Sequence, residues 1–345
     1  MKSRNQGQPI LPPEAKNIFV WHQGALGDVL LAGPALQAIA AHYPGTRLTL
    51  VGGTDQLGLL TATLPVAAVR SGHQGLWLEL FQDNQCIGSK LKNLLSQFDL
   101  ALVLTPQQRP EFLDRFKLAG ISQVLWLPSF QVHDRVAIRE LQAEKLRQAG
   151  LKKSLEPFQL KVPETDSRKA RARLQTKGND QIFRVALAPG SGQARKNWPL
   201  DHYAELARLL EEQYKAEIWW ILGPAETGWQ TELQKKFPDQ KLRLLQNLPL
   251  GQLAAAMAEF QLYVGNDSGV THLAAALGRS AVVAIFGPSD PIIWAPPGQR
   301  TIVIGAEQPC APCTPSREIN CHEAVCLPAL TPKKVLTAIS RIFPE

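Results

Sequence analysis

The sequence predicts an α/β protein made of two doubly wound parallel sheets. In both halves of the chain, short unbroken apolar runs alternate with segments of helix length. Such runs form strands that are buried on both faces, as in parallel sheets covered by helices. A length of 345 residues suits two domains, and 45% hydrophobic with 19% charged residues is an ordinary composition for a folded protein. The five cysteines are too few for a fold held together by disulfides.

The N-terminal half contains the first set of predicted strands. They are "NIFVW" at 17–21, "RLTLVG" at 47–52, "DLALVL" at 99–104 and "QVLWL" at 123–127. A charged and polar stretch follows from 152 to 180 and includes "SRKARARLQTK", which we expect to form a solvated helix. This change in composition leads us to place an N-terminal domain at 1–165.

The C-terminal half restarts the same alternation. Strands are predicted at 184–190, 217–223, 242–247, 261–266 and 280–287. Each of these ranges ends on Gly or Asn, and open parallel sheets bind ligands at the carboxyl ends of their strands. We therefore expect a second domain at 166–330 that faces the first across a cleft. The segment 331–345 carries a last predicted helix, which can pack on either domain.

Charge and the N-terminal sequence narrow the class of protein. The 37 basic and 30 acidic residues give a net charge of +7, which favours anionic ligands. No tight Lys/Arg run with interleaved aromatic residues occurs, so nucleic acid is not an expected partner. The N-terminus lacks the apolar segment of a signal peptide, and no segment has the pattern of a spanning helix. We expect a cytoplasmic protein.

The clearest anion-binding pattern is "YVGNDSGVTHLAAALG" at 263–278. It predicts a strand, a turn containing Asp267, Ser268 and Gly269, and a helix whose first turn contains His272. Backbone N–H groups at such a helix N-terminus bind anions, and the Ser268 hydroxyl adds a donor. A diphosphate fits this pattern. The alternative is that Asp267 and Ser268 only cap the helix.

Two further turns of the second half have a similar form. "LAPGSGQARKNWPLDHYAEL" at 187–206 places Gly190 and Ser191 after a strand and Lys196 before a helix. A lysine beside a glycine turn supplies positive charge to phosphate oxygens, although a solvated basic loop is the alternative. "LGPAETG" at 222–228 offers Glu226 as an acceptor for ribose hydroxyls. Together the turns favour a pocket for a nucleoside diphosphate.

Other nucleotide-binding motifs are absent from the sequence. Neither half contains G-x-G-x-x-G or the P-loop G-x-x-x-x-G-K-[ST]. An NAD-dependent oxidoreductase is therefore the weaker alternative. A protein that binds a nucleotide sugar without turning it over is the other alternative that remains open.

The first turn of the chain differs from the others because it carries a carboxylate. "FVWHQGALGDVLLAGPALQAI" at 19–39 predicts a strand, a glycine turn and a helix, with Asp28 near the helix N-terminus. The helix dipole favours a charged carboxylate there. Asp28 is therefore either a cap of the first helix or a catalytic base.

Four motifs together resemble those of glycosyltransferase family 9, the lipopolysaccharide heptosyltransferase family. They are "GALGDVLLAGPAL", "PGSGQARKNWPLDHYAEL", "GNDSGVTHLAAALG" followed by "FGPSDPIIWAPPG", and the closing cysteine segment, in the family's order from about residue 17 to the C-terminus. The resemblance implies the GT-B fold of two facing Rossmann-like domains, with the acceptor bound by the N-terminal domain and a nucleotide sugar by the C-terminal domain. It also implies inversion at the anomeric carbon, in the assembly of cell-envelope glycans.

The resemblance assigns roles to matching residues. It implies that Asp28 is the catalytic carboxylate, that Lys196 contacts the phosphate, and that the turn with Asp267, Ser268, Gly269 and His272 binds the diphosphate. Inverting transfer needs a base for the acceptor hydroxyl and stabilisation of the charge on the leaving phosphate. Because no Asp-x-Asp motif is present to hold a metal, we expect no cofactor and a metal-independent reaction. ADP-heptose is the first-choice donor.

The acceptor is expected to be a glycan or a lipid-linked glycan, so we also expect peripheral contact with the inner membrane surface. By position alone, the acceptor-binding candidates are His22, Gln23, Gly24, Arg109 and Arg135.

Four cysteines cluster near the C-terminus, at Cys310, Cys313, Cys321 and Cys326. Their spacing is close to that of zinc sites, but the second pair is four residues apart and the loop between the pairs is short. A structural metal, disulfides or redox sensitivity, and plain loop packing all remain open.

Overall fold

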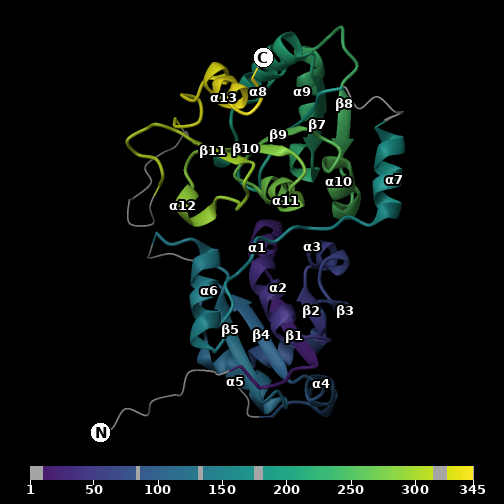
Figure 1. The fold of residues 1–345 in the computed structure, drawn as a ribbon, viewed down its shortest axis with the longest axis vertical. Coiled ribbons are helices and arrows are strands. Elements are labelled where there is room, and N and C mark those ends of the chain that lie inside the picture. The colour runs from purple at the N-terminus through teal and green to yellow at the C-terminus, as the bar shows by residue number, and fades with distance from the viewer. Residues whose placement is uncertain (1–10, 83–85, 131–134, 175–181, 314–324, 345) are drawn as a thin grey trace. The chain divides into compact units, whose positions relative to one another are not determined.

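The computed structural model describes residues 11–82, 86–130, 135–174, 182–313 and 325–344 (Figure 1). The chain divides into two compact units, residues 1–158 and 159–345, here called unit 1 and unit 2. This division lies a few residues before the domain boundary expected from the sequence, and within the polar stretch that predicted it.

Unit 1 contains a five-stranded parallel sheet in the order β3-β2-β1-β4-β5. The strands are β1 (Asn17–His22), β2 (Arg47–Gly52), β3 (Val66–Ser71), β4 (Leu100–Thr105) and β5 (Gln123–Pro128). β1 is central, and its last residue, His22, pairs with Gly52 of β2 and Leu104 of β4.

Helical segments connect these strands. They are α1 (Leu26–Leu31), α2 (Gly33–His42), α3 (Thr54–Gly58), η1 (Leu59–Ala62), η2 (Gly75–Phe81), α4 (Ser89–Leu95), α5 (Pro110–Leu118) and α6 (Ile138–Gln148). On one side of the sheet, Phe19 of β1 forms an aromatic core with Trp77 of η2 and Phe116 of α5, at ring-centroid distances of 5.8 and 5.6 Å. This core fixes the strand that leads into the first glycine turn.

Unit 2 contains a six-stranded parallel sheet in the order β11-β10-β9-β6-β7-β8. The strands are β6 (Arg184–Ala188), β7 (Glu217–Leu222), β8 (Arg243–Gln246), β9 (Leu262–Asn266), β10 (Ala281–Phe286) and β11 (Thr301–Gly305). Counted within the unit, this is the strand order of dinucleotide-binding doubly wound folds.

The helical segments of unit 2 include the last helix of the chain. They are α7 (Glu164–Arg173), η3 (Ala194–Lys196), α8 (Leu200–Tyr214), η4 (Pro224–Glu226), α9 (Trp229–Lys236), α10 (Leu250–Met257), α11 (Gly269–Leu277), α12 (Pro291–Trp294) and α13 (Pro332–Ser340). α13 packs against α8, where the Tyr214 hydroxyl lies 3.0 Å from the Ser340 hydroxyl. The last helix therefore belongs to unit 2. No helix within the described ranges has the length and apolarity needed to cross a bilayer.

Two strands, β3 and β11, were not predicted from the sequence. Each lies at an edge of its sheet, and most of its residues are partly or fully exposed. Their sequences, VAAVRS and TIVIG, each contain a short apolar run, and only the sheet order shows that these runs form edge strands. The other strands agree with their predicted ranges to within two residues.

Both sheets reverse their strand order beside the first strand of the unit. The reversal lies between β1 and β4 in unit 1, and between β6 and β9 in unit 2. Ligands of open α/β sheets bind at the carboxyl ends of the strands at this switch point. Asp28 follows β1, Lys196 follows β6 and Asp267 follows β9, so each lies after a strand at a switch point.

Candidate active site

The turn after β1 presents a carboxylate in the first turn of α1. Ala25 is the N-cap residue, and Asp28 is the third residue of the helix. Its Oδ2 accepts a hydrogen bond from the Ala25 N–H at 2.9 Å. Asp28 thus stabilises the start of α1 and remains partly exposed, so both interpretations of this residue agree with its position.

His22 lies beneath the same turn. Its side chain is 1% exposed, and its Nδ1 accepts a hydrogen bond from the Gly24 N–H at 3.0 Å. Burial lowers the pKa of His22 from 6.5 to about 4, so the imidazole is neutral at pH 7. A residue this deeply buried does not fit direct contact with an acceptor, the role that its sequence position had suggested.

The other acceptor-binding candidates lie at the same carboxyl edge of the unit 1 sheet. Gln23 is exposed, and its side-chain amide packs over the backbone of Gly72. Arg109 is exposed and is the N-cap residue of α5, which follows β4. Arg135 is exposed and follows β5. The sheet therefore places them on the side of unit 1 that carries Asp28.

In unit 2, Asn266 joins the two turns at the switch point. It is the last residue of β9 and is fully buried. Its Nδ2 donates to the Pro189 carbonyl after β6 at 2.6 Å, while its Oδ1 accepts from the Trp198 N–H and the Tyr203 hydroxyl, each at 3.0 Å. One amide side chain thus fixes both ends of the loop that carries Lys196.

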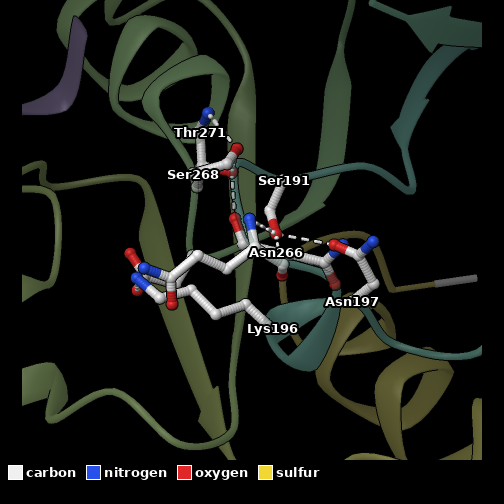
Figure 2. Close-up of polar contacts among 8 residues, drawn as sticks. Ser191, Lys196, Asn197, Asn266, Ser268 and Thr271 are labelled. Carbon is white, nitrogen blue, oxygen red and sulfur yellow. Dashed lines mark hydrogen bonds and ion pairs between the residues drawn. The ribbon is translucent and has the colours of Figure 1, made fainter. Parts of the chain in front are cut away.

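Ser191 organises the loop between these anchors. Its hydroxyl lies 2.6 Å from Asn197 Oδ1 and 2.8 Å from the Gln193 carbonyl, and it accepts from the Gln193 N–H at 3.3 Å. Figure 2 shows this hydroxyl directed toward Asn197, with Asn266 beside it. In the described structure the Ser191 hydroxyl bonds only to residues of its own loop. A hydrogen bond from this hydroxyl to a ligand would replace its bond to Asn197 or to the Gln193 carbonyl.

Lys196 and Asp267 form an ion pair between the two turns. Lys196 Nζ lies 2.7 Å from Asp267 Oδ2, and the side chains are 26% and 9% exposed. His272, on α11, is buried beside them. Burial lowers the pKa of His272 as the main effect, the Asp267 carboxylate opposes this, and the Lys196 charge adds to the lowering. The residues predicted to bind a diphosphate are therefore brought together, with the cation paired to a carboxylate.

Helix α11 begins at Gly269, and Ser268 is its N-cap residue. The Ser268 Oγ accepts from the Thr271 N–H, and the two hydroxyl oxygens are 3.2 Å apart (Figure 2). Thr271 in turn contacts the buried Tyr263 hydroxyl at 3.0 Å. Ser268 thus has the capping role that was the alternative to anion binding, at a helix N-terminus that also suits an anion.

Glu226 connects the third turn to the second. Its Oε2 accepts from the Gly223 N–H at 2.6 Å. Its Oε1 lies only 2.0 Å from where a Cβ on Gly190 would be, so Gly190 must lack a side chain. Glu226 as a whole is 7% exposed. Its role toward ribose hydroxyls stays a prediction.

Three of the clustered cysteines come near each other in the described structure. Cys326 is buried, burial raises the pKa of its thiol, and Cys313 and Cys310 raise it further. Cys310 and Cys326 are free thiols, and Cys321 lies outside the described residues. No group of three or more His, Cys, Asp or Glu side chains in the described ranges could hold a metal ion. The metal interpretation stays a prediction.

Sequence reasoning missed Asn266, Asn197 and Thr271, which hold the predicted residues in place. Asn266 was visible as a polar residue at the end of an apolar strand, which is unusual in a fully buried position. Its partners, however, lie on segments far away in the sequence. Chemically, unit 2 offers a cation, hydroxyls and a helix N-terminus, as an anion site requires, and unit 1 offers a carboxylate.

Comparison with known proteins agrees with this chemistry. The sequence model of glycosyltransferase family 9 (heptosyltransferase) matches residues 131–323. The lipopolysaccharide core heptosyltransferase OpsX of Haemophilus influenzae is 23% identical over 312 residues, which cover 84% of each chain. Lipooligosaccharide heptosyltransferase 2 of Campylobacter jejuni is 24% identical over 335 residues, which cover 94% of this chain and 98% of the relative.

Solved structures show the same fold. A glycosyltransferase of family 9 from Veillonella parvula aligns with a TM-score of 0.79 at 19% identity, covering 96% of this chain and 98% of the other. The ADP-heptose heptosyltransferase II of Escherichia coli aligns with a TM-score of 0.67 at 20% identity, covering 94% and 98%. The prediction of two Rossmann-like parallel-sheet domains of the GT-B class is confirmed.

Proposed function

Because this chain belongs to glycosyltransferase family 9, the heptosyltransferase family, we propose that it transfers heptose from ADP-heptose to a lipopolysaccharide-type acceptor with inversion of the anomeric carbon. The relatives above are named for heptose transfer in lipopolysaccharide or lipooligosaccharide. The observation that carries the proposal is the Lys196–Asp267 pair at the N-terminus of α11, at the switch point of unit 2.

In this proposal, the donor diphosphate binds in unit 2. The N-terminus of α11 and the Lys196 ammonium offset the negative charge that grows on the leaving phosphate. Asp267 holds Lys196 in place before the donor arrives, since their side chains are 2.7 Å apart. The Ser191 and Ser268 hydroxyls are further donors, and Glu226 is the proposed partner of the ribose.

The acceptor reacts at unit 1. Asp28 accepts the proton of the attacking hydroxyl, and the bond between the anomeric carbon and the diphosphate breaks on the opposite face of the sugar. Gln23, Arg109 and Arg135 lie at the proposed acceptor edge, and we propose that the two arginines attract acidic groups of the acceptor.

Incubation of the purified protein with ADP-heptose and heptose-free lipopolysaccharide tests the proposal. We expect release of ADP, addition of one heptose mass to the acceptor and inverted anomeric configuration by NMR. UDP- and GDP-sugars serve as donor controls. ADP binding without transfer to any acceptor would instead support a non-catalytic binding protein. Binding of NAD but not of ADP-heptose would support an oxidoreductase.

We further propose that transfer needs no metal ion, because Lys196 and the N-terminus of α11 supply positive charge at the proposed diphosphate position. Activity that persists after dialysis against EDTA supports this, and restoration only by added Mg²⁺ would contradict it. Metal analysis of the untagged protein tests the cysteine segment separately. Stoichiometric zinc or iron there would indicate a structural metal.

A lipid-linked acceptor would bring the protein to the inner membrane surface, and we propose peripheral contact there. Sedimentation with vesicles containing anionic lipid, compared with neutral vesicles at rising salt, tests this. Equal sedimentation with both vesicle types would contradict an electrostatic contribution.

A further inference from the structure

The turn after β1 has two consecutive backbone amides, and each is bound by a side chain. The Gly24 N–H donates to His22 Nδ1 at 3.0 Å, and the Ala25 N–H donates to Asp28 Oδ2 at 2.9 Å. Because the two amides belong to adjacent residues, a rotation of the Gly24 peptide also moves the amide that Asp28 binds. The position of the carboxylate is therefore coupled to the hydrogen bond of the imidazole.

The space around Gly24 makes this coupling tight. A Cβ on Gly24 would lie 2.6 Å from His22 Cε1, 2.7 Å from Asp28 Cβ and 2.9 Å from Asp28 Oδ2. The edge of the imidazole and the carboxylate thus lie against the same side of one backbone position. A side chain at position 24 would therefore displace the imidazole, the carboxylate or both.

The burial of His22 restricts what its imidazole can do. At 1% exposure it does not reach a substrate, so it acts neither as the base nor as an acceptor ligand. Its Nε2 is buried and has no hydrogen-bond partner among the described residues. Leucine or phenylalanine would fill similar space without burying an unpartnered polar atom. What the imidazole adds over such residues is the acceptor nitrogen Nδ1.

We propose that His22 is a positioning residue for Asp28, and that its unprotonated Nδ1 holds the Gly24 amide and so fixes the turn that presents the carboxylate to the acceptor hydroxyl. This inference rests on the proposed function, because it assumes that Asp28 is the base. It requires the neutral imidazole with its proton on Nε2, since a protonated Nδ1 cannot accept from Gly24.

Two substitutions separate the acceptor nitrogen from the volume of the ring. His22→Leu keeps an apolar side chain but removes the acceptor. His22→Asn provides a side-chain oxygen that can accept from the amide two residues later, as asparagine does in Asx turns. His42→Leu, at the end of α2 in the same unit, is the matched control.

With ADP-heptose and heptose-free lipopolysaccharide, we expect His22→Leu to lower kcat at least tenfold. The Kd for ADP, measured by calorimetry, should stay within twofold of the wild-type value. His22→Asn should recover kcat to within about threefold of wild type, and His42→Leu should leave it unchanged. The proposal is overturned if folded His22→Leu keeps its kcat, or if folded His22→Asn is as slow as His22→Leu.

Asp28→Asn, assayed in parallel, distinguishes failure of this inference from failure of the proposed function. If Asp28→Asn is inactive and His22→Leu is fully active, only the role of His22 is wrong. If Asp28→Asn is active, the assignment of the base itself is wrong. Should His22→Leu not fold, ¹⁵N NMR of the wild-type histidines decides. A proton on Nδ1 of His22 at pH 7 would overturn the proposal, and a proton on Nε2 alone would support it.

Discussion

The turn after β1 and the turn after β9 both lie where the strand order of their unit reverses, after the first strand of unit 1 and the fourth strand of unit 2, yet they offer opposite chemistry. Each follows a central strand beside the point where the strand order reverses, and each leads into a helix. Each also has a buried histidine, His22 or His272, whose pKa burial lowers. Both turns thus lie at a switch point beside a buried imidazole, and they differ in the charged groups that they carry.

The difference lies in which groups hold each turn. In unit 1, the amides of Gly24 and Ala25 are bound by His22 and Asp28, and the charged group that the turn presents is a carboxylate. In unit 2, the buried Asn266 binds the backbone, and a lysine from the neighbouring turn joins the site. A carboxylate suits an incoming hydroxyl, and a cation at a helix N-terminus suits a leaving phosphate. The following predictions test this contrast.

The largest expected effect is that of Asp28→Asn. Loss of a general base typically costs a factor of about 10² to 10⁴, and we expect kcat to fall by about 10³. The Kd for ADP should not change, because the substitution lies in unit 1. Asp55→Asn is the control, since Asp55 occupies the first turn of α3 after the neighbouring strand. Near-normal turnover by Asp28→Asn would contradict the role of this carboxylate as the base, and with it the proposed chemical difference between the two turns.

Lys196→Met should have the second largest effect. Removal of one preorganised donor costs about 3 kcal/mol of transition-state stabilisation, or about a hundredfold in kcat/KM. ADP binding should weaken too, because the substitution leaves the mostly buried Asp267 carboxylate without its cation. Lys235→Met, which breaks an exposed pair with Glu232, should change neither quantity. Unchanged ADP affinity in Lys196→Met would contradict the assignment.

Acid should destabilise unit 1 through His22. Its pKa is about 4 in the folded protein and 6.5 in the unfolded chain, so the unfolded state binds the proton first as the pH falls. The stabilisation is fully present above pH 6.5 and is lost as the pH falls toward 4, with a loss of roughly 2 kcal/mol by pH 5. Urea unfolding from pH 7.5 to 5 should show a smaller pH dependence in His22→Asn. Identical pH dependence in both proteins would refute the prediction.

Gly190→Ala should have the smallest of these effects, about a tenfold loss of ADP affinity by analogy with other strained substitutions. Its new Cβ would lie 2.0 Å from Glu226 Oε1 and would force that carboxylate away from the turn. At Gly192, two residues further on, a Cβ would meet no atom within 4 Å. Calorimetry should therefore find normal ADP binding in Gly192→Ala. Equal losses in both variants would indicate loop flexibility rather than the contact with Glu226.

Much of this molecule could be predicted from local sequence. The central strands were found because burial on both faces requires unbroken apolar runs such as "NIFVW" and "AVVAIF". The position of Asp28 in the first turn of a helix followed from "GALGD". By contrast, β3 and β11 are partly exposed edge strands, and His22 showed no local sign that it would be buried and bonded to Gly24.

The sequence by itself determined the fold class, the family and the turns at which chemistry is expected, because each depends on residues that are close together in the chain. Only the tertiary structure decided how the turns combine. Lys196 pairs with Asp267 and Asn266 bonds to Pro189 because β9 lies beside β6, although β7 and β8 separate them in the sequence. Strand order depends on packing across the whole unit, so no local pattern specifies it.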